Sequence, residues 1–331
     1  MNKRMMTGRE VVLRSLEFSC PERIPLLEKD PFVTRKDADM VILYWRPRTD
    51  FFPLKSGMDE WGCMWKSMNP EAGDQGQVVE HPLFDWKKAS GYLFPDPFAP
   101  GRVEWLEPSV KDLRKSGKFL CGSLGHGPMH LMPDIRGFEG YLTDMVEYPE
   151  RTEFLLDGIF NFLTGLTLRY SGMKLDAIWI WDDQATQNGL LFSIKTWCRF
   201  FKPRYTKLFD LAHSRGMKVF MHTCGHIGEH LPHLIDSGVD AIDNKQPSLW
   251  MDSPSAVLAK GRISFSTCLD IQTTINNIPL EKVEEETSRL VRRLSIPSGG
   301  FIGTCYSSKD LGIPVEKTYR MIKSFKNFRW D

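Results

Sequence analysis

The 331-residue chain lacks an excess of either charge, because 43 lysines and arginines face 42 aspartates and glutamates for a formal net charge of +1. Such a chain has no broad field that would gather nucleic acid or anionic lipid. It has no apolar run long enough to span a membrane, and charges interrupt the apolar positions of its N-terminus, unlike those of a signal peptide. We therefore expect a soluble, cytoplasmic protein whose partner is a small molecule or another protein.

Cysteine is sparse, and the common nucleotide-binding motifs are missing. The seven cysteines are scattered and odd in number, so they form no disulfide framework, and most should be buried thiols unless a metal recruits them. Neither G-x-G-x-x-G nor G-x-x-x-x-G-K-[ST] occurs. The commonest reason to expect an open, nucleotide-binding sheet is therefore absent.

Short apolar runs alternate with amphipathic, helix-length segments over most of the chain. Thr7 and Glu10 have capping-box spacing and predict an opening helix. Alternating strands and helices predict a parallel sheet. Gly216 and Gly238 precede two of the runs and suit helix ends. The predicted strands are KFLCGS near 118, DAIWIWDD near 176, MKVFMHTCG near 217, VDAID near 239, RISFST near 262 and GGFIGT near 299.

The periodicity fits both an open sheet and a closed barrel, but polar residues gather after the ends of the runs, which favours a barrel. We predict a single α/β domain over 1–331, a (β/α)8 TIM barrel. Residues 45–110, rich in tryptophan and proline, are predicted to be an irregular insertion or lid near the C-terminal rim. The polar residues in question are Asp182, Asp183, His222, Cys224, Asp243, Gln246, Thr267, Cys268, Thr304 and Cys305.

The stretch MHTCGHIGEH raises the possibility of a metal site. Residues two apart on a strand share a face, so His222 and Cys224 can reach one point near the barrel axis. Catalytic zinc takes three such donors and keeps a fourth position open. From the residues alone, Cys305 and Cys268 are both candidates for the third donor. An isolated H-x-C is equally compatible with small core cysteines and a histidine bonded to the backbone.

The segments WDDQATQNG through MKVFMHTCG, LIDSGVDAIDNKQP and GGFIGTCYSS resemble the uroporphyrinogen decarboxylase superfamily, and within it the zinc-dependent methyltransferases that serve cobalamin proteins. The opening TGREVVLRSLEFSCPERIPL is similar too, so the resemblance covers nearly the whole chain. It implies that His222, Cys224 and Cys305 bind Zn2+. The arginine-rich N-terminal stretch of the decarboxylase branch is replaced here by LEKDPFVTRKDADM, which disfavours a substrate with many carboxylates.

The resemblance further implies methyl transfer between a substrate and a corrinoid (cobalamin) held by a separate corrinoid protein. DLAHSRG, from Asp210 to Gly216, has one residue too many for the D-x-H-x-x-G cobalamin motif, so we expect no tightly bound corrinoid in this chain. WDDQATQNG is similar to bacterial members that demethylate aromatic methyl ethers, which makes an aryl methyl ether the predicted substrate. The alternatives are a methylcobalamin:thiol methyltransferase, uroporphyrinogen decarboxylase and a closed, purely structural zinc site.

Two acids and three further side chains complete the predicted site. Asp182 and Asp183 could share a proton, which would suit one of them to protonating a leaving phenoxide or orienting a metal ligand. The alternative is a helix cap or an ordinary loop carboxylate. Contacts to the substrate are predicted for Trp181, Gln187 and Gln246. Tryptophans of this kind can line a flat apolar pocket, although packing alone also explains them.

Overall fold

A parallel sheet curled into a barrel forms the centre of the protein. The computed structural model describes residues 4–47, 56–67, 76–306 and 311–330. Within them, seven parallel strands pair in the order β1-β5-β6-β7-β8-β9-β10. These strands are β1 (Met40–Tyr44), β5 (Phe119–His126), β6 (Ala177–Trp181), β7 (Lys218–His222), β8 (Ala241–Asp243), β9 (Ser264–Thr267) and β10 (Phe301–Gly303).

A very short segment connects the two edges of this sheet. Leu26 bridges to Gly303 and Leu27 bridges to Met40, both in parallel. The Leu27 N–H donates to the Gly303 carbonyl at 3.0 Å, and the Glu28 N–H donates to the Met40 carbonyl at 2.9 Å. The eighth barrel position is thus filled by residues 26–27, and the predicted (β/α)8 architecture is confirmed.

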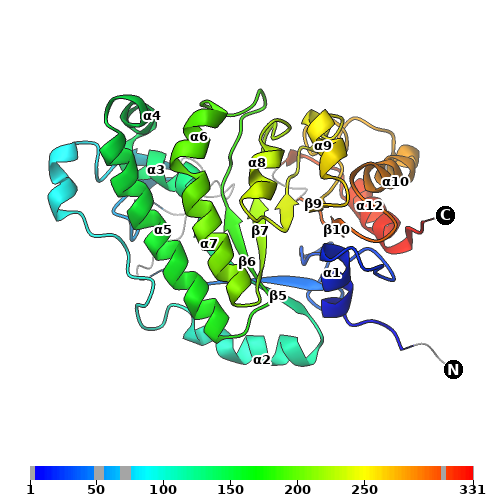
Figure 1. Cartoon of the computed structure of the whole chain (residues 1–331). Coiled ribbons are helices and arrows are strands. Elements are labelled where there is room, and N and C mark those ends of the chain that lie inside the picture. The colour runs from blue at the N-terminus through cyan, green and yellow to red at the C-terminus, as the bar shows by residue number, and fades with distance from the viewer. Residues whose placement is uncertain (1–3, 48–55, 68–75, 307–310, 331) are drawn as a thin grey trace.

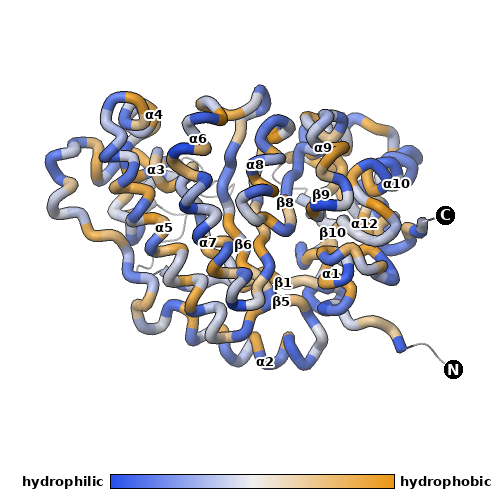
Figure 2. Tube along the Cα trace, in the orientation of Figure 1, coloured by the Kyte–Doolittle hydropathy of each residue, from blue (hydrophilic) through white to orange (hydrophobic). Residues whose placement is uncertain are grey.

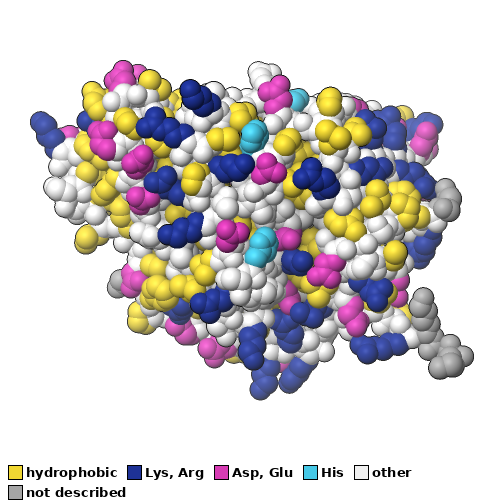
Figure 3. All heavy atoms as spheres, in the orientation of Figure 1, with side chains coloured by type: hydrophobic (Ala, Val, Ile, Leu, Met, Phe, Trp, Pro, Cys, Tyr) yellow, Lys and Arg dark blue, Asp and Glu magenta, His cyan; other side chains and the backbone are white. Residues whose placement is uncertain are grey.

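Helices surround the barrel, as Figure 1 shows. Much of α10 is hydrophilic in Figure 2, whereas β6 is largely hydrophobic. Figure 3 shows lysines and arginines interspersed with acidic side chains over the visible face, in line with the balanced composition. The helices are α2 (Glu107–Lys115), α3 (Pro128–Arg136), α4 (Phe138–Glu147), α5 (Pro149–Gly172), α6 (Ile194–Phe200), α7 (Lys202–Ser214), α8 (Leu231–Asp236), α9 (Pro254–Ala259), α10 (Val283–Leu294) and α12 (Val315–Asn327).

The opening helix α1 (Gly8–Leu16) closes the amino end of the barrel. Thr7 and Glu10 form the predicted capping box. The Ser15 hydroxyl donates to the Phe301 carbonyl at the start of β10, and Val12 and Leu16 join the buried cluster inside the barrel. Because this end is plugged, the carboxyl ends of the strands are left to form the site.

The strands and helix ends predicted from side-chain periodicity are found in the structure. All six predicted strands are present, and the residues before two of them, Gly216 and Gly238, have φ of +74° and +99° just after α7 and α8. Phe220 packs inside the barrel, whereas Val219 and Met221 belong to the outer core beneath the helices. The sequence analysis missed β1 and the segment at 26–27. No helix among the described residues is long and apolar enough to cross a membrane.

The predicted 45–110 insertion contains a small antiparallel sheet, β2 (Gly57–Met58), β3 (Met64–Lys66) and β4 (Gln77–Glu80). Two parts of the insertion, 48–55 and 68–75, lie outside the described residues. Its Glu60 makes a two-pronged ion pair with Arg102, at 2.9 and 2.8 Å. The Arg102 side chain is fully buried and that of Glu60 is 7% exposed. That the insertion and the barrel form one domain stays a prediction.

We expect Arg102→Met to lower the free energy of unfolding by about 3–5 kcal/mol, because it leaves the Glu60 carboxylate buried without its partner. Denaturant and thermal unfolding would measure this loss. The double variant Arg102→Met, Glu60→Leu should recover much of it, since no charge then remains unpaired. A double variant as unstable as the single one would show that packing around Arg102, and not the charge, is responsible.

Candidate metal centre

The site is a row of paired residues at the carboxyl ends of neighbouring strands. Sheet register sets His126 beside Trp181, Trp181 beside His222, and His222 beside Asp243. Each residue comes at or next to the end of its strand, so short-range pairing brings distant parts of the sequence together. A pocket of about 280 Å³ opens over this row and is also lined by Tyr44, His130, Trp179, Asp183, Cys224, Lys245, Thr304 and Cys305, among others.

His222 is held by a carboxylate on the next strand. Its Nδ1 lies 2.5 Å from Asp243 Oδ2, while Asp243 Oδ1 accepts hydrogen bonds from Lys245 Nζ and Ser266 Oγ. Burial raises the pKa of Asp243, but Lys245 and His222 outweigh that effect and hold it below its usual range. A carboxylate bonded to one imidazole nitrogen orients the ring and leaves the other nitrogen as a ligand atom. Here that free atom is Nε2.

Cys224 is placed by the loop that follows β7. Its N–H donates to Asp183 Oδ1 at 2.7 Å. The next residue, Gly225, has φ +83°, and a Cβ there would lie 2.3 Å from the Ala185 carbonyl oxygen. Glycine is therefore required by both conformation and space. The Gly225 N–H donates to Gln246 Oε1 at 2.7 Å, which fixes the loop further.

The ligand atoms of Asp183, His222 and Cys224 all lie within 4.8 Å of one another, the single such group of three among the described residues. His222 Nε2 and Cys224 Sγ are 3.6 Å apart. Zinc bonds of about 2.0–2.1 Å to nitrogen and 2.3 Å to sulfur, at a tetrahedral angle, give a separation of about 3.6 Å. The nitrogen, sulfur and oxygen donors therefore fit a zinc ion.

The predicted third donor lies nearby but outside this group. Cys305 lines the same pocket, and burial raises its pKa to about 11 although Lys245 and Lys29 lower it. Cys268, the other candidate, is 1% exposed and does not line the pocket. The structure adds Asp183 as a competitor for the third ligand position.

The two adjacent aspartates have different surroundings. Asp182 is completely buried, and its carboxylate accepts from Met129 N, Gln184 Nε2 and Tyr205 Oη, away from the pocket. Asp183 lines the pocket. Burial raises its pKa, but His130 and His222 outweigh burial and hold it below the usual range. Burial raises the pKa of Asp182, which lies outside the pocket lining and contacts the pocket residue His130. The proton-donor role of the pair stays a prediction.

Two histidines of the pocket were missed by the sequence analysis. His126 and His130 stack with ring centroids 4.7 Å apart. His130 lies 3.6 Å from both Asp182 and Asp183 through its two ring nitrogens. Burial disfavours a charge on His130, but these aspartates raise its pKa to about 10. Burial lowers the pKa of His126 to about 4, with His130 adding to the effect. Their signal was the i, i+4 pair in GHGPMH at the end of β5.

The three predicted substrate contacts have different positions. Trp181 lines the pocket, and its ring centroid lies 4.8 Å from that of His222. Gln246 is 5% exposed and supports the loop at Gly225. Gln187 donates to Gln272 at 2.8 Å and does not line the pocket. Trp181 alone is placed to touch a ligand beside His222.

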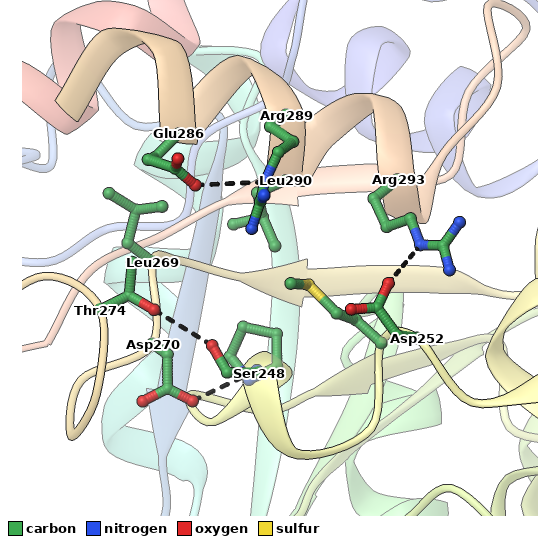
Figure 4. Close-up of a pocket in the computed structure, with 11 residues that line it drawn as sticks. Ser248, Asp252, Leu269, Asp270, Thr274, Glu286, Arg289, Leu290 and Arg293 are labelled. Atoms are coloured by element: carbon green, nitrogen blue, oxygen red, sulfur yellow. Dashed lines mark hydrogen bonds and ion pairs between the residues drawn. The ribbon is translucent and has the colours of Figure 1, made fainter. Parts of the chain in front are cut away.

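Another cavity, shown in Figure 4, lies between the loops after β8 and β9 and helix α10. Its charged groups pair with each other: Arg293 lies 2.8 Å from Asp252, and Arg289 lies 3.1 Å from Glu286. Ser248 bonds Thr274 and Asp270. None of the predicted site residues lines this cavity.

A protein-family model matches residues 67–293, more than half of the chain, and its description is uroporphyrinogen decarboxylase (URO-D). The chain belongs to the URO-D family. This membership confirms the superfamily that the sequence resembles. No curated protein sequence matches the chain significantly.

Two solved structures resemble this URO-D protein to different degrees. A methyltransferase from Methanosarcina mazei superposes with a TM-score of 0.69 at 15% identity, over 97% of this chain and 98% of that one. An endo-beta-1,4-xylanase from Gloeophyllum trabeum matches at a TM-score of 0.40 and 11% identity, over 69% and 81% of the two chains. At these identities the first match establishes the fold, and the second carries no further argument.

Metal binding by this URO-D protein should depend on the side chains at the carboxyl ends of β7 and β8. We expect His222→Ala and Cys224→Ala to lose zinc, because each removes a donor atom. Asp243→Asn should weaken zinc affinity about 10–100-fold, since the imidazole loses its orienting carboxylate. Metal content after dialysis and competition with a chromogenic chelator would measure these effects.

Comparison of Cys305→Ala with Asp183→Asn would identify the third ligand, because only the true ligand should match the loss seen for Cys224→Ala. Cys268→Ala is the matched control, a buried cysteine outside the pocket, and should keep its zinc. Stoichiometric zinc in both His222→Ala and Cys224→Ala would remove the metal centre from this pocket.

Proposed function

We propose that this URO-D protein is a zinc-dependent methyltransferase that moves a methyl group from an aryl methyl ether to the Co(I) corrinoid of a separate corrinoid protein. The observation that carries the proposal is the 3.6 Å separation of His222 Nε2 and Cys224 Sγ at the edge of an accessible pocket. The full-length structural match to a methyltransferase supports it at the level of fold.

His222 and Cys224 would hold the zinc, with Cys305 or Asp183 as the third donor. Bound there with a position open, zinc supplies Lewis acidity toward an ether oxygen and stabilises the negative charge that the oxygen gains. Asp243 and Lys245 keep the His222 ring in its ligand orientation. The aromatic side chains of Trp181 and Tyr44 line the pocket and offer apolar surface to an aryl ether.

The overall reaction breaks the bond between the methyl carbon and the ether oxygen and forms a bond from that carbon to cobalt. The electron pair of the broken bond stays on the oxygen as a phenolate, and the cobalt supplies the pair for the new bond. The proposal places the corrinoid on a separate protein. The DLAHSRG segment ends helix α7, and His213 Nε2 lies 2.8 Å from Asp240, outside the pocket lining.

The decarboxylase alternative needs cationic partners for a tetrapyrrole with many carboxylates. The described residues that line the pocket include Lys29 and Lys245 but no arginine, and Lys245 is engaged by Asp243. A methylcobalamin:thiol methyltransferase would use the same metal donors, and the structure favours neither over the other at the metal. The aromatic walls favour the aryl ether.

The proposal predicts cobalt methylation that requires three components: the zinc-loaded enzyme, a methoxy aromatic such as 2-methoxyphenol, and a corrinoid protein or free reduced cobalamin. The change in cobalt absorption would report it, together with release of the demethylated phenol. Cys224→Ala should reduce kcat/KM at least about 100-fold, since a truncated ligand removes the metal's stabilisation of developing charge. Cys268→Ala should retain activity.

Two other results would redirect the assignment. Transfer of methyl from methylcobalamin to a thiol, with no reaction of methoxy aromatics, would establish the thiol methyltransferase. Release of carbon dioxide from a tetrapyrrole acid by metal-free enzyme would establish a decarboxylase and would remove both zinc and methyl transfer.

A further inference from the structure

A second cavity adjoins the metal pocket. Its volume is about 370 Å³, and Tyr44 and His126 line both cavities. It lies between the ends of β1 and β5 and the inserted segment that carries β2 and β3. Tyr44 and His126 therefore form the boundary that the two cavities share. We call the second cavity the ring cavity.

The ring cavity has rigid aromatic walls. Phe162 packs edge-on against Trp45 and Trp61, with ring centroids 5.4 and 5.2 Å apart and interplanar angles of 72° in both cases. Trp65 also lines the cavity, and its Nε1 donates to Asp59 Oδ2 at 2.7 Å. Rings locked by each other and by a hydrogen bond form a preformed slot for a flat apolar group.

Three carboxylates line this cavity, and two of them are fully engaged. Arg102 holds both oxygens of Glu60. Asp59 accepts from the N–H groups of Trp61 and Cys63 and from the Trp65 indole. Both oxygens of each of these two carboxylates are therefore already hydrogen-bonded within the protein.

The third carboxylate, Asp134, is different. Its backbone carbonyl is used by Cys63 Sγ and His81 Nδ1, but among the described residues its carboxylate makes no hydrogen bond. Burial raises the pKa of Asp134 to about 7, against a smaller lowering by His130. A half-buried acceptor without a partner is costly unless a ligand or water satisfies it.

Among the described residues that line the ring cavity, no unpaired cationic side chain compensates the charge of these carboxylates. No lysine or arginine lines the ring cavity, and the guanidinium of Arg102 behind it is committed to Glu60. His126 is neutral near pH 7 because burial lowers its pKa to about 4. An aromatic carboxylate would therefore find no lysine or arginine as a counter-ion in the described lining, whereas a hydroxyl or ammonium group would find an acceptor.

We infer that the ring cavity binds the aromatic ring of the ether substrate and that Asp134 accepts a hydrogen bond from an O–H or N–H group at the end of the ring opposite the methoxy group. The inference rests on the proposed function for the placement of the methoxy group at the metal pocket. It names the substrate class more narrowly: methoxylated phenols or benzylamines, and not methoxybenzoates.

Equilibrium binding to the zinc-loaded enzyme, without corrinoid, would test this separately from catalysis. The probes are anisoles with one para substituent: 4-methoxyphenol, 4-methoxybenzylamine, 4-methylanisole and 4-methoxybenzoate. Tryptophan fluorescence or calorimetry would follow binding. We expect the phenol and the amine to bind about 10-fold more tightly than 4-methylanisole, and the benzoate to bind more weakly than 4-methylanisole.

Two substitutions assign the preference to Asp134. Asp134→Leu should abolish the advantage of the phenol over 4-methylanisole and relieve the penalty on the benzoate. Asp134→Asn keeps size and an acceptor oxygen, so it should relieve the benzoate penalty while retaining part of the phenol preference, and it guards against misfolding of the leucine variant. Asp112→Leu, at an exposed position on α2, is the matched control and should leave all four affinities unchanged.

Benzoate binding as tight as that of the phenol, or an unchanged preference in both Asp134 variants, would overturn the inference. So would tight binding of tetramethylammonium without binding of the phenols, which would make the cavity a cage for a methylated cation. Phenol-selective binding without cobalt methylation would refute the proposed function but support the assignment of the ring cavity. Equal kcat/KM for methyl transfer from the phenol and the benzoate would support the proposed function but refute that assignment.

Discussion

The hydrogen bond from His222 Nδ1 to Asp243 Oδ2 joins the fold to the site, and it depends on the register of two parallel strands. β7 and β8 pair so that His222 lies directly beside Asp243, which is why a 2.5 Å contact forms between side chains 21 residues apart. The bond leaves Nε2 free to face Cys224. A slip of one residue would turn both side chains to the outside of the barrel, where the helices pack.

The same register extends to both sides of this pair. Trp181 lies beside His222, His126 lies beside Trp181, and Ser266 lies beside Asp243. Closure of the barrel through residues 26–27 curves this row around one mouth, and α1 seals the opposite end. The inserted segment then adds the tryptophan walls next to His126. The barrel thus contributes the polar chemistry, and the insertion contributes the apolar surroundings.

Sequence patterns predicted the parts of the molecule that depend on local periodicity. The strand at 218–222 and its inward-facing Phe220 and His222 follow from side-chain alternation. β1 at 40–44 was missed because it follows an irregular stretch, and the segment at 26–27 is too short to show any period. The same alternation should have separated Asp182 from Asp183, since neighbours on an extended chain point to opposite sides. Their different surroundings in the structure follow from that rule.

Other features depend on contacts between residues that are far apart in the sequence, and no sequence pattern predicts them. Cys305 and Asp183 are both candidates for the third ligand because β6 and β10 end at the same mouth of the barrel. The hydrogen-bond partners of Gln187 and Gln246 are set by how the loops pack, which the spacing of residues in the sequence does not reveal. Asp134 lies on helix α3, outside the motifs of the sequence, and it became notable only when Glu60 and Asp59 proved to have hydrogen-bond partners.

At both cavities a buried cation is ion-paired with a buried carboxylate of the protein. In the metal pocket Lys245 is bound to Asp243, and behind the ring cavity Arg102 is bound to Glu60. Each of these cations stabilises a buried carboxylate and is therefore lost to ligand recognition. A substrate carboxylate that bound either of these two cations would have to break its existing ion pair. A neutral aromatic ether needs no counter-ion, so it leaves both ion pairs and the orienting hydrogen bond of His222 intact. The arrangement therefore suits such a molecule better than an acidic one.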